Sequence, residues 1–246
     1  MAKVLIVGDT HGEDTPLNIA RKNIDNVDHV VFVGDYCDSF TSQWLPKQKA
    51  VLSSIIDFYK EYSDKVHLLI GNHDFQYMGG IQKCSGCQFG AIPNIVPFFR
   101  KNIQYFDILF KCDNWIFSHA GISQFWYNNK FGSNDNIVDH KTSPWESVDD
   151  INLAFHSGVI NCFEPLGDDI YGNDIRESPL WIRPNALLNN MLSGYNQVVG
   201  HTELTSNNRI FVDKSGEHKL VIVDSVDRNV YAIIDTTADT CQIFVD

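Results

Sequence analysis

Five short apolar runs in this sequence each lead into a polar residue of a kind that binds cations. The runs are Val4–Val7, Val30–Val33, Val66–Ile70, Trp115–Ser118 and Gln197–Val199. The polar residues that follow them are Asp9, Asp35, Asn72, His119 and His201. Short apolar runs bounded by glycine are typical of buried strands, and ligands of open α/β sheets bind beyond the carboxyl ends of the strands. Because a glycine lets the backbone turn sharply there, we expect these side chains to point into one crevice.

Helical segments separate the first three of these strands. Pro16–Ile24 has Thr15 as a candidate N-cap and a proline at its first position. Lys47–Tyr62 places its apolar residues at helical spacing. This alternation predicts a parallel sheet. Further along the chain, Ile103–Lys111 is predicted as a strand and Ser147–Phe155 as a helix.

The last quarter of the sequence is mostly β. Strands are predicted at Arg209–Val212, Lys219–Val223, Val230–Ile234 and Cys241–Val245, joined by polar turns. An α/β first half followed by a β meander predicts the α/β class, with a two-sheet β-sandwich core flanked by helices in four α/β/β/α layers. No linker divides the sequence, so we expect a single domain over residues 1–246.

Composition excludes several classes of function. The chain has 19 Lys and Arg residues against 31 Asp and Glu, a net charge of −12, so no non-specific nucleic-acid binding is expected. The apolar run near the start breaks at Gly8-Asp9, which is too early for a signal peptide, and no run is long enough for a membrane span. With six cysteines and no secretory signal, we expect reduced thiols and a cytoplasmic location.

The residues at the strand ends have a common chemistry. Asp, Asn and His supply the oxygen and nitrogen ligands that suit Mn, Fe or Zn. A carboxylate such as Asp35 can bridge two cations, and paired cations stabilise the attacking and leaving oxygens in phosphoryl transfer. The pattern therefore predicts a dinuclear metal site.

The motifs, in this order, resemble those of the calcineurin-like metallophosphoesterases. The order is Asp-x-His, Gly-Asp-x-x-Asp, Gly-Asn-His-Asp, then a single His, then Gly-His. Gly34-Asp35-Tyr36-x-Asp38, Ser118-His119-Ala120-Gly121 and Gly200-His201-Thr202 are similar in particular to the bacterial and phage-type serine/threonine phosphoprotein phosphatases. The resemblance extends from residue 8 to about residue 202.

This resemblance implies a role for each matched residue. Asp9 and His11 would bind one metal, Asp35 would bridge, and Asn72, His119 and His201 would bind the second. His73 would be the general acid that protonates the leaving oxygen, oriented by Asp38. A hydroxide bridging the metals would be the nucleophile. The two divalent ions would be Mn, with Fe, Zn and Ni as alternatives.

Three positions depart from the phosphoprotein phosphatases. Ser39 stands where they usually carry a phosphate-binding arginine, Asp74 stands where they have glutamate, and Glu203 follows Gly200-His201-Thr202, where many phosphodiesterases have a second metal-binding histidine. Glu203 is thus either a metal ligand or a surface carboxylate. We expect Arg183 to replace the missing arginine, because a planar guanidinium can bind two phosphate oxygens at once; its alternative role is a structural ion pair.

The predicted function is a phosphomonoesterase that acts on small phosphoesters, nucleotides or phosphoproteins. A phosphodiesterase or nucleotide polyphosphate hydrolase of the same fold is an alternative, as is a non-catalytic scaffold that keeps the fold for protein binding. Cys84 and Cys87 form either a metal or redox pair, or a tight loop with two free thiols. We expect substrate specificity to reside in the irregular segment 133–174.

Overall fold

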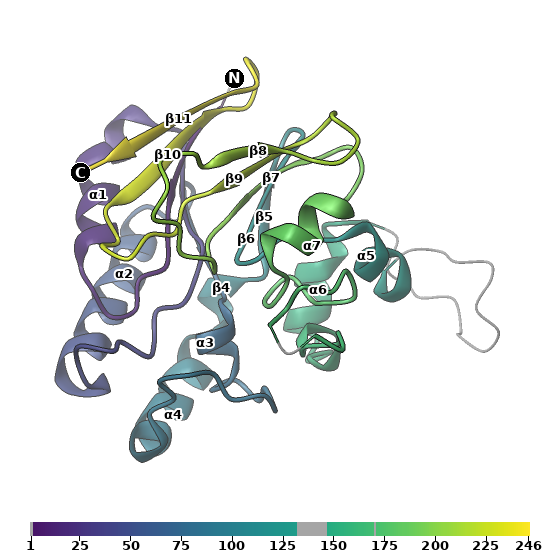
Figure 1. The fold of residues 1–246 in the computed structure, drawn as a ribbon. Helices are drawn as coiled ribbons and strands as arrows, with labels where there is room; N and C mark the ends of the chain where they lie inside the picture. Colours follow the sequence, from purple (N-terminus) through teal and green to yellow (C-terminus); the bar gives the residue numbers. More distant parts are fainter. Residues whose placement is uncertain (1, 132–146, 170) are drawn as a thin grey trace.

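The strands form two sheets that pack face to face, in the computed structural model that describes residues 2–131, 147–169 and 171–246 (Figure 1). The first sheet has the order β11-β10-β1-β2-β3-β4. Its strands are β1 (Lys3–Val7), β2 (His29–Phe32), β3 (Val66–Leu69), β4 (Phe106–Asp107), β10 (Val230–Asp235) and β11 (Thr240–Val245). The strands β1 to β4 run parallel, as the alternating pattern predicts, and β10 joins β1 in antiparallel fashion.

The second sheet has the order β5-β6-β7-β9-β8. Its strands are β5 (Leu109–Cys112), β6 (Trp115–Ser118), β7 (Asn196–Val199), β8 (Ile210–Val212) and β9 (Lys219–Ile222). Here β6, β7 and β9 are parallel neighbours, so their carboxyl ends meet at one edge.

Strand β1 shows how the sequence pattern builds the sandwich. Successive side chains of a strand point to opposite faces, and all four residues from Val4 to Val7 are buried. Val4 and Ile6 belong to the apolar cluster between the two sheets, together with Trp115 and Phe117 of β6. Leu5 and Val7 belong instead to the cluster beneath the helices. A strand buried on both faces therefore reads as a continuous apolar run rather than an alternating one.

Helices cover the outer faces of the sandwich. In Figure 1, α1 (Thr15–Asn23) and α2 (Lys49–Glu61) lie on one side, and α5 (Gln124–Lys130), α6 (Asp150–His156) and α7 (Pro184–Asn189) lie on the other. The short α3 (Asn72–Phe75) and α4 (Ile92–Asn102) lie below the sheets. None of the helices in the described part of the chain is long and apolar enough to cross a membrane.

Three local predictions are wrong. Ile103–Lys111 is not one strand: a 3₁₀ turn precedes β4 in the first sheet, and β5 in the second sheet follows after the single buried residue Ile108. The last quarter is not one meander, because β8 and β9 join the second sheet whereas β10 and β11 complete the first. Thr15 does not cap α1 but is its first residue, and Asp14 holds the N-cap position.

The remaining elements lie within a few residues of their predicted bounds. The helix predicted over Lys47–Tyr62 is α2, which a π-type turn over Trp44–Gln48 precedes. The predicted Ser147–Phe155 begins three residues later, as α6. The segment 133–174, in which we expect specificity, lies partly outside the described residues.

Candidate metal centre

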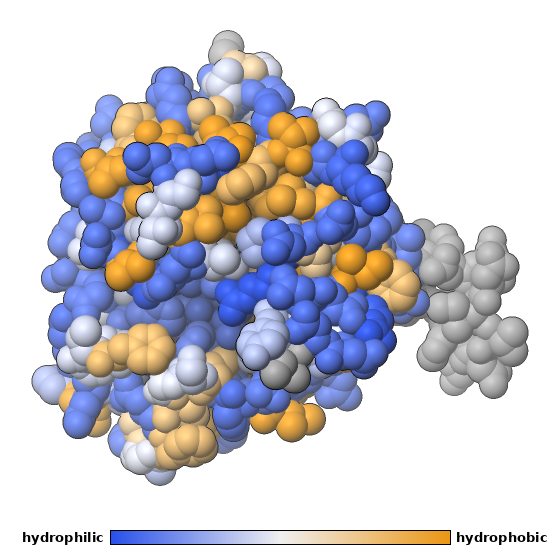
Figure 2. Space-filling model, viewed as in Figure 1, coloured by the Kyte–Doolittle hydropathy of each residue, from blue (hydrophilic) through white to orange (hydrophobic). Residues whose placement is uncertain are grey.

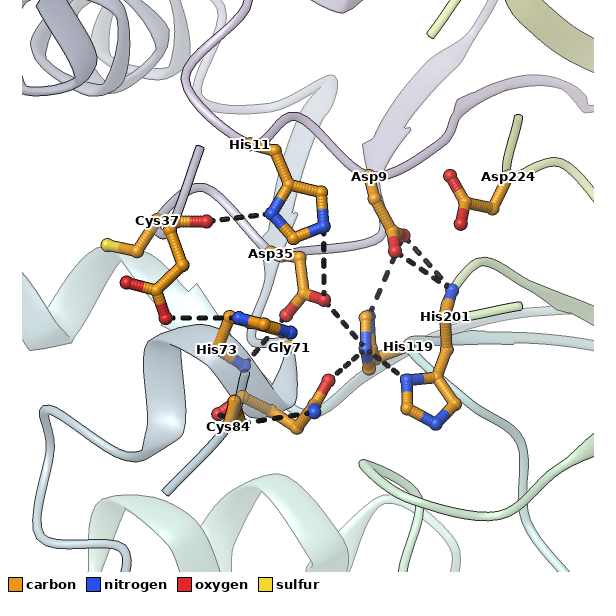
Figure 3. Close-up of polar contacts among 12 residues, drawn as sticks. Asp9, His11, Asp35, Cys37, Gly71, His73, Cys84, His119, His201 and Asp224 are labelled. Carbon is orange, nitrogen blue, oxygen red and sulfur yellow. Dashed lines mark hydrogen bonds and ion pairs between the residues drawn. The ribbon is translucent and has the colours of Figure 1, made fainter. Parts of the chain in front are cut away.

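The polar residues that follow the five strands converge at the edge where the two sheets meet (Figure 3). Asp9, Asp35 and Asn72 come from the first sheet, following β1, β2 and β3. His119 and His201 come from the second sheet, following β6 and β7. This convergence is what parallel strands with a common carboxyl edge produce.

The backbone at these positions takes an unusual conformation. Four residues of this region are in the left-handed region of φ, namely His11 (43°), Asp35 (51°), Asp38 (63°) and His201 (62°). For residues other than glycine this costs about 1–2 kcal/mol each, and such residues cluster where surrounding structure fixes them for function. The sharp turns that we expect after the strands are therefore made partly by the polar residues themselves.

Backbone carbonyls fix the orientation of three histidine rings. The Nδ1 of His11 lies 2.8 Å from the carbonyl oxygen of Cys37, and the Nδ1 of His119 lies 2.9 Å from that of Val33. The Nε2 of His201 lies 3.2 Å from the carbonyl oxygen of Trp181. A carbonyl only accepts hydrogen bonds, so each of these nitrogens carries the proton. The other nitrogen of each neutral ring then presents a lone pair to the centre, as in metal-binding histidines.

Lone pairs consequently face one another around His119. Its Nε2 lies 2.9 Å from the Oδ1 of Asn72 and 3.2 Å from the Nδ1 of His201. The Asn72 amide is oriented by its Nδ2, which donates to the Sγ of Cys84 at 3.3 Å, so its oxygen faces the ring. Acceptors this close repel one another unless a cation lies between them. The donor set therefore fits a metal ion better than it fits hydrogen bonding alone.

Asp35 lies between two groups of possible ligands. One group consists of His11, Asp35 and His73, and the other of Asp35, His119 and His201. The Oδ2 of Asp35 is 3.7 Å from the Nε2 of His11 and 3.4 Å from that of His119, and its Oδ1 accepts from the backbone N–H of His73 at 2.9 Å. A carboxylate shared by two groups is the geometry of a bridging ligand.

The charges of the buried residues match this arrangement. Burial raises the pKa of the Asp35 carboxyl, but the surrounding histidines outweigh it and lower the pKa overall, so Asp35 stays ionised. Burial lowers the pKa of His11 to about 4 and also lowers the pKa values of His119 and His201. These rings are therefore neutral, which is the form that binds metals.

His73 differs from the other histidines. Burial opposes its protonation, but Asp35 and the hydrogen-bonded Asp38 raise its pKa above the ordinary value. The Nδ1 of His73 is 3.0 Å from the Oδ2 of Asp38. Asp38 is fully buried and also accepts hydrogen bonds from the hydroxyl of Tyr77 at 2.5 Å and from the side chain of Gln76. The carboxylate thus holds the His73 ring in one orientation, with Nε2 directed away from Asp38.

Arg183 lies beside the centre, on the side of His201. Its Nη1 donates to the carbonyl oxygen of His201 at 2.8 Å and to the Oγ1 of Thr202 at 3.1 Å. With Asn72 and His201 it lines a cavity of about 980 Å³. The guanidinium of Arg176, by contrast, is paired with Asp168 and Asp174 of its own loop.

A carboxylate that sequence reasoning missed lies next to Asp9. Asp224 follows β9, has an exposed fraction of only 1%, and lies beside Asp9 in Figure 3. Its carboxylate pairs with Arg228 at 2.7 Å, and the same guanidinium reaches Glu203 at 2.8 Å. Glu203 is therefore an ion-pair partner at the rim. The sequence does contain a signal for this residue, because Asp224, like Asp9 and Asp35, comes soon after an apolar run.

Asp74 and Cys84 support the centre from behind. The Asp74 carboxylate accepts the backbone N–H groups of Tyr36 (2.9 Å), Cys37 (3.1 Å) and Gly71 (3.1 Å), and so ties the loops after β2 and β3 together. All six cysteines, including Cys84 and Cys87, are free thiols. Cys84 thus contributes a hydrogen bond to Asn72 rather than a disulfide.

Comparison with known proteins agrees with this geometry. Residues 2–202 match the calcineurin-like phosphoesterase family. The chain belongs to the calcineurin-like phosphoesterases. A comparison with curated protein sequences finds no match. Membership of this family, together with the His and Asp groups around Asp35, makes the chain a metal-dependent phosphoester hydrolase.

Solved structures of low sequence identity share the fold. One is a protein serine/threonine phosphatase from Saccharomyces cerevisiae with similarity to human phosphatase PP5. It is 14% identical in sequence and gives a TM-score of 0.55, and the match covers 100% of this chain and 80% of the phosphatase chain. Another is a putative diadenosine tetraphosphatase, 16% identical, with coverage of 99% and 93% and a TM-score of 0.52. Both confirm the two-sheet α/β architecture.

Proposed function

We propose that this phosphoesterase is a cytoplasmic phosphomonoesterase that uses two divalent cations, with Mn²⁺ the preferred ion. The motifs around Asp35 and His119 resemble those of the phosphoprotein phosphatase branch, apart from Ser39, and this resemblance supports monoester substrates. Free thiols at all six cysteines are usual in a reducing compartment and support the location.

The proposed ligands divide between two ions that share Asp35. Asp9 and His11 complete the first set, and Asn72, His119 and His201 complete the second. Oxygen and imidazole ligands of this kind suit Mn, Fe, Zn or Ni. When bound, the two cations would neutralise the phosphate oxygens and lower the pKa of an attacking water.

The contact between His73 and Asp38 carries the catalytic part of the proposal. Burial opposes protonation of His73, but Asp35 and Asp38 raise its pKa above the ordinary value. The protonated ring is thereby favoured, and it can donate its proton from Nε2 to the leaving oxygen. Asp38 fixes the tautomer and orientation for that transfer, at 3.0 Å. Arg183, on the side of His201, would bind a phosphoryl oxygen. It would take over the role of the arginine that the phosphoprotein phosphatases usually carry at the position of Ser39.

Two esters with different leaving groups test the role of His73. p-Nitrophenolate leaves readily without a proton, whereas phenolate is a poorer leaving group. We expect His73→Ala to reduce turnover of phenyl phosphate by about 10²–10⁴-fold and that of p-nitrophenyl phosphate far less. Equal losses for both esters would contradict proton donation by His73.

Asp35→Asn serves as the control for the metal centre. We expect this variant to lose both activities and to retain fewer than two Mn²⁺ per chain after dialysis. An active Asp35→Asn variant with two bound ions would refute the proposed bridge.

Phosphodiester or nucleotide hydrolysis is a second candidate. The cavity beside Arg183 measures about 980 Å³, at the upper end for small-molecule sites, and it would accommodate a second substituent on the phosphate. Preference for bis-p-nitrophenyl phosphate over p-nitrophenyl phosphate would favour this candidate.

A further inference from the structure

An exposed aromatic side chain lies next to the metal centre. Phe40 follows Ser39 in the loop between β2 and α2, and it is 70% exposed. Its ring centroid lies 6.2 Å from that of His11, with the two planes tilted by 48°. A phenylalanine ring therefore lies beside one of the proposed metal ligands.

The position of the Phe40 ring depends on Gly86. A methyl group added at Gly86 would lie 3.0 Å from the Cε1 and 3.3 Å from the Cζ of Phe40. The bare backbone of Gly86 thus forms a close support for the ring. Phe40 is in contact with the protein on this side and open to solvent elsewhere.

Phe40 also lines an uncharged hollow. The hollow measures about 610 Å³, and none of the described residues that line it is charged; Trp44 and Gln88 are among them. Figure 2 shows apolar side chains on the lower left of this face, over the loop between β2 and α2 and over α4. A group bound here would meet an aromatic ring and neutral polar atoms.

Phe40 connects the hollow with the centre, because it lines the hollow and its ring lies against that of His11. The ring of His11 lies edge-on to that of His73, with centroids 5.0 Å apart, so Phe40, His11 and His73 follow one another along this side of the centre. The cavity beside Arg183 is a separate one, which borders Asn72 and His201.

We propose that Phe40 determines specificity by packing against an uncharged, ring-bearing leaving group of the phosphoester. The inference rests on the proposed function, because His73 marks the departing oxygen. Face or edge contacts between rings contribute about two- to tenfold in affinity beyond area burial. The substrate class that fits is therefore a phosphoester of a neutral aromatic alcohol or phenol.

Benzyl phosphate and ethyl phosphate provide a matched test, because both release a primary alcohol of low acidity and differ mainly in the ring. With the Mn²⁺-loaded protein we expect kcat/KM to favour benzyl phosphate by about tenfold. Phe40→Ala should reduce this ratio to near one, and Phe40→Tyr should preserve it. Phe89→Ala is the control: Phe89 is 67% exposed in the neighbouring loop but does not line the hollow, so its ratio should match that of the wild type.

An unchanged ratio in Phe40→Ala, or a wild type without preference for the ring, would overturn the inference. Benzylphosphonate and ethylphosphonate, which are not hydrolysed, allow the same comparison by calorimetric titration. If neither ester is turned over while two Mn²⁺ are bound, the proposed function fails. The ratio of phosphonate affinities then still decides the role of Phe40.

Discussion

Gly71→Ala isolates the packing around Asp35. Gly71 has φ of −101°, a conformation open to any residue, so the substitution introduces no backbone strain. A methyl group at this position would lie 2.0 Å from the Oδ1 of Asp35 and 2.5 Å from its backbone nitrogen. Ordinary contact begins at 3.4 Å, so the carboxylate would have to move by about 1.4 Å, and its hydrogen bond from His73 would be lost.

The cost follows from that displacement. Forcing a methyl group into a packed interior costs about 1–3 kcal/mol of folding free energy. A misplacement of about 1 Å in a positioned catalytic group costs on the order of 10² in rate. We expect Gly71→Ala to lose about 2 kcal/mol of stability, to bind Mn²⁺ more weakly and to lose about 10²-fold in kcat.

Gly90→Ala is the matched control, because no atom lies within 4 Å of an added methyl group there. Urea unfolding measures the stability of both variants, and titration calorimetry measures Mn²⁺ binding. Mn²⁺ binding and turnover by Gly71→Ala equal to those of Gly90→Ala would show that the space at Gly71 does not position Asp35.

Three further predictions concern charged groups. Arg228→Gln leaves the buried Asp224 carboxylate without its cation, so urea unfolding should show a loss of about 3 kcal/mol in the free energy of unfolding. Glu203→Gln removes the half-exposed partner of the same guanidinium and should cost less than about 1 kcal/mol. Equal losses in the two variants would contradict the view that the buried pair with Asp224 is the stronger one. Burial lowers the pKa of His67 to about 4, so its contribution to stability is present above pH 6.5 and is lost as pH falls towards 4, by about 2–3 kcal/mol. His67→Gln should flatten this pH dependence when urea unfolding is measured above pH 6.5 and near pH 4. Arg183→Lys should raise KM about tenfold, because an ammonium cannot bind two oxygens in one plane, and an unchanged KM in steady-state kinetics would show that Arg183 does not bind substrate.

The convergence of the strand ends could be predicted from the sequence because it depends on local signals. Each apolar run fixes a strand, parallel order places the carboxyl ends together, and glycine or a left-handed residue makes the turn. Asp9, Asp35 and Asn72 therefore lie where the pattern puts them. The same logic fails at Ile103–Lys111, where the apolar run continues through the buried Ile108 while the chain passes from one sheet to the other.

Long-range contacts could not be predicted in this way. The carbonyl that orients His119 belongs to Val33, 86 positions earlier in the sequence. Asp224 lies beside Asp9 only because β9 pairs with β7, and no glycine precedes it to mark a functional turn. The role of Cys84 in orienting Asn72 likewise depends on a loop that brings together residues 12 positions apart.

The division of the centre between two sheets has a mechanical consequence. Asp9, His11, Asp35 and Asn72 belong to one layer of the sandwich, and His119 and His201 belong to the other. Cations bound by ligands from both sheets would cross-link the two sheets at this edge. At the opposite edge, Lys219 and Asn196 of the second sheet bind Asp239 of the turn between β10 and β11. These contacts do not depend on a cation, so amide hydrogen exchange there would be least sensitive to added Mn²⁺.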